Sequence, residues 1–297
     1  MKNCDIQIRD PFILPVQATG DYYLFGSTDK NTWSGPAQGF DCYRGKDLEN
    51  WEGPIPAFRP GKGFWSTINF WAPEVHFYQS RYYMFASFKE PGHYRGTQIL
   101  TSDVPSGPYR PLTEGPVTPD EWECLDGTLH VDAEGMPWIV FCHEWVQVHN
   151  GAIYTMRLSP DLKRAAARPV FLFNASESPW LPKRTSWPAA DSGYKFPTYV
   201  TDGPFLYRTR DGSLLMIWSS HAGAGYAMGT ARSVSGRIDG PWIHDVKPLW
   251  TKDGGHGMIF RTFDGRLMLT LHTPNQTPKE RAIIVEIVDT GSAIRLK

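Results

Sequence analysis

Short hydrophobic runs recur along the chain, and each one follows a polar turn. The runs are rich in aromatic and β-branched residues, and they occupy residues 22–27, 82–87, 138–142, 214–218 and 267–271. Their first residues lie 60, 56, 76 and 53 positions apart, so the pattern repeats about every 60 residues. Turn residues followed by β-branched and aromatic residues predict β-hairpins. We therefore expect five repeats of one β-rich unit.

Each run is preceded by another short segment with a distinctive polar opening. These openings lie at residues 10–13, 72–75, 126–129, 202–206 and 255–259. A further element, rich in Ser, Asp, Gly and Pro, recurs at residues 47–51, 102–109, 159–162 and 233–242. Four-stranded antiparallel units repeated around an axis are the blades of a β-propeller. We predict an all-β fold in which residues 1–297 form one five-bladed β-propeller around a central channel. A β-sandwich is the alternative, but it does not call for the same polar opening five times.

Composition excludes several other classes of protein. The 28 glycines and 25 prolines are scattered along the 297 residues, which leaves no segments long enough for a helical bundle. A formal net charge of -1 gives no electrostatic signature of binding to nucleic acid or to an anionic membrane. The chain has 12 tryptophans, more than a core needs, and exposed aromatic faces can stack on sugar rings.

Two features bear on the cellular compartment. The four cysteines show no metal-binding or disulfide spacing, so we expect mostly buried thiols. The first residues lack the apolar stretch of a secretory signal. We expect a cytoplasmic protein if this start is the native one, and a periplasmic or secreted protein if a signal peptide was removed.

The polar openings predict that several candidate catalytic residues lie close together at the channel. The first strand of every propeller blade lines the channel, so residues at matching positions converge. The residues brought together in this way are Asp10, Glu74, Asp126, Asp202 and His256. Taken singly, each acid can be a turn residue, since Asp-Gly and Asp-Pro are turn dipeptides. Crowded carboxylates, however, push one another's pKa values apart, which separates acid and base roles. We therefore predict an active site at the channel mouth.

The motifs at these openings resemble one enzyme family along the whole chain. In order, they are Arg9-Asp10-Pro-Phe-Ile, Trp71-Ala-Pro-Glu74-Val, Asp126-Gly-Thr-Leu, Asp202-Gly-Pro-Phe-Leu-Tyr-Arg and Gly255-His256-Gly. Together they are similar to glycoside hydrolase family 43. The resemblance implies a five-bladed propeller with an active-site pocket at the channel mouth. It also implies hydrolysis of furanosides or xylosides in plant or microbial polysaccharides, with inversion at the anomeric carbon.

The resemblance also implies roles for three acids. Asp10 matches the general base, and Asp126 matches the aspartate that orients the general acid and raises its pKa. Asp202 stands where the family has the general acid, a glutamate in a Glu-Gly-Pro motif. Its carboxyl is shorter by about one carbon–carbon bond, on the order of 1.5 Å. A misplacement of about 1 Å can cost roughly 100-fold in rate. Glu144 is the reserve candidate for the acid. The alternative is that Glu144 is a residue of the pocket rim with no part in proton transfer.

The remaining candidates concern ligands. His256 matches a family histidine near a channel metal, usually calcium, and a hydrogen bond to a carboxylate is the alternative; no organic cofactor is expected. Arg208 and Arg261 are candidates for binding sugar hydroxyls, with solvated strand ends as the alternative. The candidate pocket walls, for which core or rim packing is the alternative, are Trp71, Trp33, Phe70 and Trp145.

We therefore expect an exo-acting, inverting glycosidase that removes terminal α-L-arabinofuranose from an oligosaccharide or polysaccharide. A β-D-xylosidase and a β-D-galactofuranosidase are alternatives on the same scaffold. A carbohydrate-binding propeller that is weak or inactive in catalysis is the alternative from another class, because of the short acid at position 202.

Overall fold

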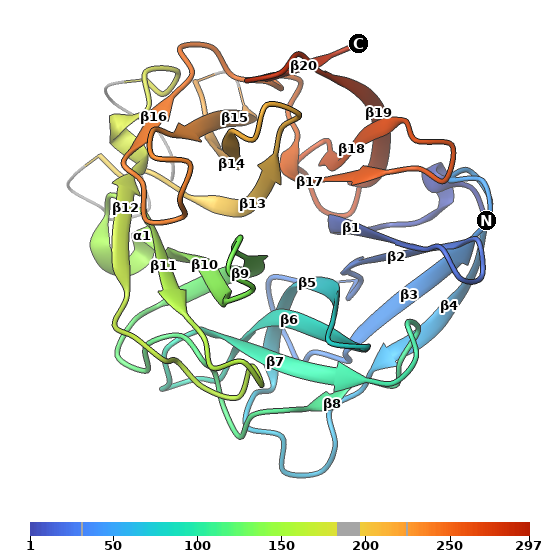
Figure 1. Ribbon diagram of the computed structural model, residues 1–297. Helices are drawn as coiled ribbons and strands as arrows, with labels where there is room; N and C mark the ends of the chain where they lie inside the picture. The colour runs from blue at the N-terminus through green and yellow to red at the C-terminus, as the bar shows by residue number, and fades with distance from the viewer. Residues whose placement is uncertain (31, 183–196, 224) are drawn as a thin grey trace.

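The computed structural model describes residues 1–30, 32–182, 197–223 and 225–297. Strands dominate this part of the chain and form five four-stranded antiparallel sheets around a common centre (Figure 1). Each sheet is built from one continuous stretch of the chain, so the strands follow one another from the centre outward. The five-bladed β-propeller predicted from the sequence is confirmed.

The first two strands of each blade coincide with the segments expected from the repeat. The innermost strands are β1 (Arg9–Val16), β5 (Ile68–Tyr78), β9 (Cys124–Val131), β13 (Asp202–Arg208) and β17 (Gly255–Arg261). The second strands are β2 (Asp21–Ser27), β6 (Arg81–Lys89), β10 (Pro137–His143), β14 (Leu214–His221) and β18 (Leu267–Thr273). Their apolar runs are almost entirely buried, because both faces of a second strand pack against neighbouring blades.

The outer strands complete the blades. The third strands are β3 (Phe40–Gly45), β7 (Gly96–Ser102), β11 (Ala152–Arg157), β15 (Tyr226–Ser233) and β19 (Arg281–Asp289). The fourth strands are β4 (Trp51–Phe58), β8 (Arg110–Pro111), β12 (Val170–Asn174), β16 (Trp242–His244) and β20 (Ile294–Leu296). Within the described residues, three short helical turns lie between strands or before them: η1 (Asn3–Asp5), α1 (Trp145–Val148) and η2 (Ala175–Glu177). No helix in the described ranges is long and apolar enough to cross a membrane.

The ring closes between the first and last blades without a shared sheet. Strand β1 packs against β17 and β18, and the residues before β1 reach the outer strand β19. There Gln7 forms a β-bridge with Arg281, and the Ile8 amide donates a hydrogen bond to the Glu280 carbonyl at 3.4 Å. Because Ile6 and Ile8 are fully buried, this N-terminal segment seals the joint with apolar contacts.

Every innermost strand carries a bulge at the same end. In each strand this bulge holds one residue with positive φ, and these residues are Asp10 (54°), Ala72 (49°), Asp126 (55°), Gly203 (52°) and His256 (49°). Strand β5 has a second bulge before it, which holds Asn69 (49°). Positive φ is costly for residues other than glycine, and such strain gathers at functional sites. The register places Asp10, Asp126 and His256 at equivalent positions, as expected. The expectation was wrong in detail for the other two blades, where the bulges put Ala72 and Gly203 at that position.

These bulges also join each blade to the one before it. The backbone amides of Ala72, Asp126 and His256 donate to the hydroxyls of Ser27, Ser87 and Ser219 at 2.8, 2.9 and 2.8 Å. His272 Nδ1 accepts the corresponding bond from the Asp10 amide at 3.1 Å. The Gly203 amide instead donates to Asp126 Oδ2 at 3.0 Å. The same contacts that hold adjacent blades together therefore fix the candidate catalytic residues.

Candidate active site

A pocket of about 580 Å³ opens where the five innermost strands meet. Every blade contributes to its lining, through Asp10, Trp71, Asp126, Asp202 and His256. The structure thus brings together the three acids singled out in the sequence. It also places the candidate wall residues Trp33 and Trp145, and the reserve acid Glu144, on the same pocket.

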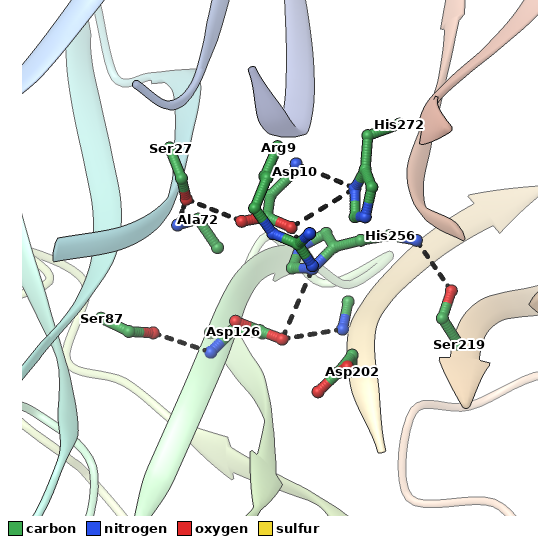
Figure 2. A network of polar contacts seen from close by, with 12 residues as sticks. Arg9, Asp10, Ser27, Ala72, Ser87, Asp126, Asp202, Ser219, His256 and His272 are labelled. Atoms are coloured by element: carbon green, nitrogen blue, oxygen red, sulfur yellow. Dashed lines mark hydrogen bonds and ion pairs between the residues drawn. The ribbon is translucent and has the colours of Figure 1, made fainter. Parts of the chain in front are cut away.

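Asp10 lies in a cationic environment. Its Oδ2 accepts a hydrogen bond from Ser27 Oγ at 2.6 Å, and its Oδ1 lies 3.2 Å from His256 Nδ1 (Figure 2). Burial acts to raise the pKa of Asp10, but the charges of His256 and Arg9 outweigh it and lower this pKa below its usual value. Asp10 is therefore ionised at neutral pH, as a general base must be.

Asp126 and Asp202 are shifted in the opposite direction. Asp126 Oδ2 accepts the Gly203 amide and lies 3.6 Å from His256 Nδ1. Burial and then the nearby charge of Asp10 raise the pKa of Asp126 well above its usual value. Asp202 Oδ2 accepts a hydrogen bond from the Tyr226 hydroxyl at 2.8 Å, and burial followed by the charge of Asp126 raises the pKa of Asp202 to about 7. There is therefore a range of pH in which Asp202 keeps its proton while Asp10 is ionised.

Replacement of Asp126 tests this electrostatic coupling. In Asp126→Asn a neutral amide replaces the carboxyl whose ionised form helps to raise the pKa of Asp202, so this pKa falls toward the value that burial alone gives it. A general acid works only while protonated, and the alkaline limb of the pH–rate profile should therefore move to lower pH, with a lower maximal rate. The measurement is kcat/KM against pH for both proteins. An unchanged profile at a normal rate would remove Asp126 from the site.

Gly203 allows the fourth blade to approach His256. At its positive φ, an added Cβ would lie 2.6 Å from His256 Cδ2 and 2.7 Å from Cγ. We expect Gly203→Ala to displace His256 or the adjacent Asp202, with a loss of activity of about 10-fold or more. The melting temperature should fall by about 2–4 °C for each kcal/mol by which the substitution lowers the free energy of unfolding.

Gly212 offers a matched control for that variant. It also has positive φ, at 88°, but an added Cβ would meet nothing within 4 Å. Gly212→Ala therefore imposes the backbone strain without the contact. If both variants lose activity equally, the close approach to His256 is not what Gly203 provides.

Aromatic rings form one wall of the pocket. Trp71 and Trp33 pack edge to face with ring centroids 5.2 Å apart, and the Trp71 indole N–H donates to the Thr32 carbonyl at 2.6 Å. The Arg9 guanidinium lies 4.7 Å from the Trp33 ring. Trp33 is nevertheless 51% exposed, so it presents apolar ring surface at the pocket rim.

Four candidates from the sequence lie elsewhere, which corrects those expectations. Phe70 is 1% exposed and packs in the core against Phe88, with centroids 4.8 Å apart. Glu74 is buried beside His76, with Oε2 3.1 Å from Nε2, and does not line the pocket. The bulge of β5 between Trp71 and Glu74 puts Ala72, and not Glu74, at the position equivalent to Asp10.

Arg208 and Arg261 are exposed at the far ends of β13 and β17. Arg208 donates to backbone carbonyls, and Arg261 donates to the Tyr207 hydroxyl at 3.2 Å. A strand rises about 3.3 Å per residue, so six residues of β13 put Arg208 about 20 Å from Asp202. Nearness to a motif in sequence therefore did not mean nearness to the pocket.

Several pocket residues were missed in the sequence because they come from outer strands or loops. Tyr226 begins β15 and holds Asp202, and Arg95 lies just before β7. His272 of β18 does not line the pocket but contacts Asp10, and it was missed as well. It takes the place that serine has near the end of other second strands, and burial lowers its pKa to about 3. A comparison of Ser27, Ser87 and His272 at the ends of their hydrophobic runs would have singled out this last residue.

The residues around His256 do not form a protein-built calcium site. Among the residues described, no group of three or more His, Cys, Asp and Glu side chains is arranged to hold a metal ion. Calcium takes six to eight oxygen ligands. His256 offers one imidazole whose Nδ1 faces the Asp10 carboxylate at 3.2 Å. We therefore assign no step to a metal.

Comparisons with known proteins agree with this geometry. The pattern of the family described as "Glycosyl hydrolases family 43" matches residues 5–289. The crystal structure of an endo-arabinase from Bacteroides thetaiotaomicron VPI-5482 is 40% identical with a TM-score of 0.89, over 99% of each chain. An endo-1,4-beta-xylanase structure from the same organism is 23% identical with a TM-score of 0.76, covering 100% of this chain and 96% of that one, and shares the fold.

A curated relative gives a shorter match. It is the extracellular endo-alpha-(1->5)-L-arabinanase 1 of Bacillus subtilis (strain 168), 24% identical over 144 residues. The match covers 44% of this chain and 45% of that protein, so it spans less than half of either.

Proposed function

The chain belongs to glycosyl hydrolases family 43, and we propose that it is an arabinanase that cleaves internal α-L-arabinofuranosyl linkages. An oligosaccharide or polysaccharide substrate follows from the family. The choice of arabinan is supported by the 40% identity to an endo-arabinase over the whole chain. The same similarity favours an endo mode over the exo mode expected from the sequence.

The observation that carries the chemistry is the opposite shift of two carboxyls in one buried pocket. Asp10, with its lowered pKa, accepts a proton from the attacking water. Asp202, with its pKa raised to about 7, donates a proton to the leaving oxygen. Burial first, and then the ionised form of Asp126, raise the pKa of Asp202, and Asp126 fixes the fourth blade through the Gly203 amide. A separate base and acid correspond to single displacement with inversion.

The pocket wall supports binding of more than one sugar unit. Trp71 lies beside the acids, whereas Trp33 exposes half of its surface at the rim. Rings in these two positions can contact successive sugars of a chain, which an enzyme acting inside a polymer must hold on both sides of the scissile bond. The Bacillus subtilis relative is described as extracellular, so we infer an extracytoplasmic location.

Product lengths from linear α-1,5-arabinan test the proposal. An endo-acting enzyme releases a range of oligosaccharides from the start, whereas an exo-acting enzyme releases one short product throughout. Xylan and a galactofuranosyl polymer, run in parallel, test the alternative sugars. Binding of arabino-oligosaccharides without hydrolysis of any substrate would identify a catalytically inactive binding propeller instead.

A further inference from the structure

Arg95 is a buried arginine in the pocket with an unused donor. Its side chain is about 8% exposed and lines the pocket together with Trp71 and Glu144. Arg95 Nε donates to Glu144 Oε2 at 3.2 Å, but Nη1 is buried without a hydrogen-bond partner among the described residues. A buried donor without an acceptor is costly, and more so when it carries charge. The position therefore calls for an acceptor that arrives with a ligand.

Both the guanidinium and the backbone of Arg95 are held in place. Its Cζ lies 3.8 Å from the centroid of the Trp71 ring, a cation–π contact. The Arg95 backbone amide donates to Glu123 Oε2 at 2.8 Å, and Glu123 in turn pairs with Lys89. A donor fixed in this way loses little conformational entropy when a ligand binds.

Glu144 supplies the complementary acceptor. It precedes α1, and its own amide donates to the Glu123 carbonyl at 2.8 Å. Its Oε2 faces Arg95. Burial raises the pKa of Glu144, although the charge of Arg95 opposes this shift.

We propose that Arg95 and Glu144 form a hydroxyl-binding clamp for a neutral sugar unit of the substrate, with Trp71 as the support for Arg95. A sugar hydroxyl accepts a hydrogen bond from Arg95 Nη1 and donates one to the Glu144 carboxylate. The charge of Arg95 is already balanced by Glu144, so an anionic ligand gains little from Arg95 and is repelled by Glu144. The clamp therefore selects neutral sugars over uronic acids. This inference rests on the proposed carbohydrate-cleaving function and assigns the pocket a further binding contact.

Binding measurements separate the clamp from catalysis. The parent protein is the full chain with Asp10→Asn, and calorimetry gives its Kd for arabinotriose, xylotriose, galactotriose and trigalacturonic acid. Arg95→Met removes the donor, and Arg95→Lys keeps a cation opposite Glu144 without the planar set of N–H groups. We expect each variant to weaken binding of the preferred neutral sugar by about 10-fold or more.

A surface arginine provides the matched control. Arg81 pairs with Asp103 at 2.7 Å and does not line the pocket, so Arg81→Met should leave the Kd unchanged. Melting curves identify any variant that fails to fold, and Arg95→Lys decides the test if Arg95→Met does not fold.

The binding data distinguish failure of the clamp from failure of the arabinan proposal. Unchanged binding in the folded Arg95 variants overturns the clamp, as does a parent that binds no neutral sugar or binds trigalacturonic acid as tightly. If the parent prefers xylotriose or galactotriose and the Arg95 variants lose that binding, the clamp stands and the arabinan proposal fails.

Discussion

Asp10→Asn is expected to lower the rate of arabinan hydrolysis by at least about 100-fold, because removal of a general base usually costs at least this much. Asparagine has the same shape and tolerates the positive φ of 54° at this position, so the bulge of β1 can persist. What is lost is the ionised carboxyl that His256 and Arg9 maintain. The melting temperature should therefore change little compared with the loss of activity.

Asp264→Asn is a suitable control for this variant. Asp264 is 61% exposed in the turn before β18 and pairs with Arg266 at 2.9 Å, away from the pocket. It should retain full activity. If Asp10→Asn loses its fold together with its activity, Asp10 is a structural residue of the bulge and not the base.

Asp202→Ala is expected to reduce cleavage of natural arabinan by about 100-fold or more, while sparing substrates with good leaving groups such as dinitrophenol. An arabinosyl leaving oxygen needs a proton, whereas dinitrophenolate departs without one. The wild-type pH–rate profile should accordingly fall on its alkaline side near pH 7, because the pKa of Asp202 is raised to about 7. The measurement is kcat for arabinan and for a dinitrophenyl arabinofuranoside, in the wild type and the variant.

Asp202→Glu complements this experiment by lengthening the side chain. Activity should rise if the acid of the wild type falls short of the leaving oxygen. It should fall if the pocket is fitted to aspartate, whose Oδ2 accepts the Tyr226 hydroxyl at 2.8 Å. If neither Asp202 variant alters cleavage of arabinan, Asp202 is not the acid, and Glu144 is the next residue to replace.

The sequence predicted the architecture because turns and hydrophobic runs repeat with the spacing of blades. It could not predict the register at the pocket, because bulges decide which residue of an innermost strand faces inward. Glu74 illustrates this, because the bulge of β5 between Trp71 and Glu74 puts Ala72 at the position of Asp10. The pattern of the innermost strands also gives no sign of Tyr226 and Arg95, since these residues lie in an outer strand and a loop, which carry no periodic signal toward the centre. Tertiary packing, not local sequence, brings these two residues to the acids.

The most direct test of this account is the anomeric configuration of the first sugar released. Proton NMR during the first minutes of arabino-oligosaccharide hydrolysis distinguishes the two anomers before they interconvert. Asp10 as the base and Asp202 as the acid predict a single displacement, so a β-configured reducing end should appear first from an α-linkage. Initial release of the α-anomer would show that a covalent intermediate forms, which would contradict the roles assigned to Asp10 and Asp202.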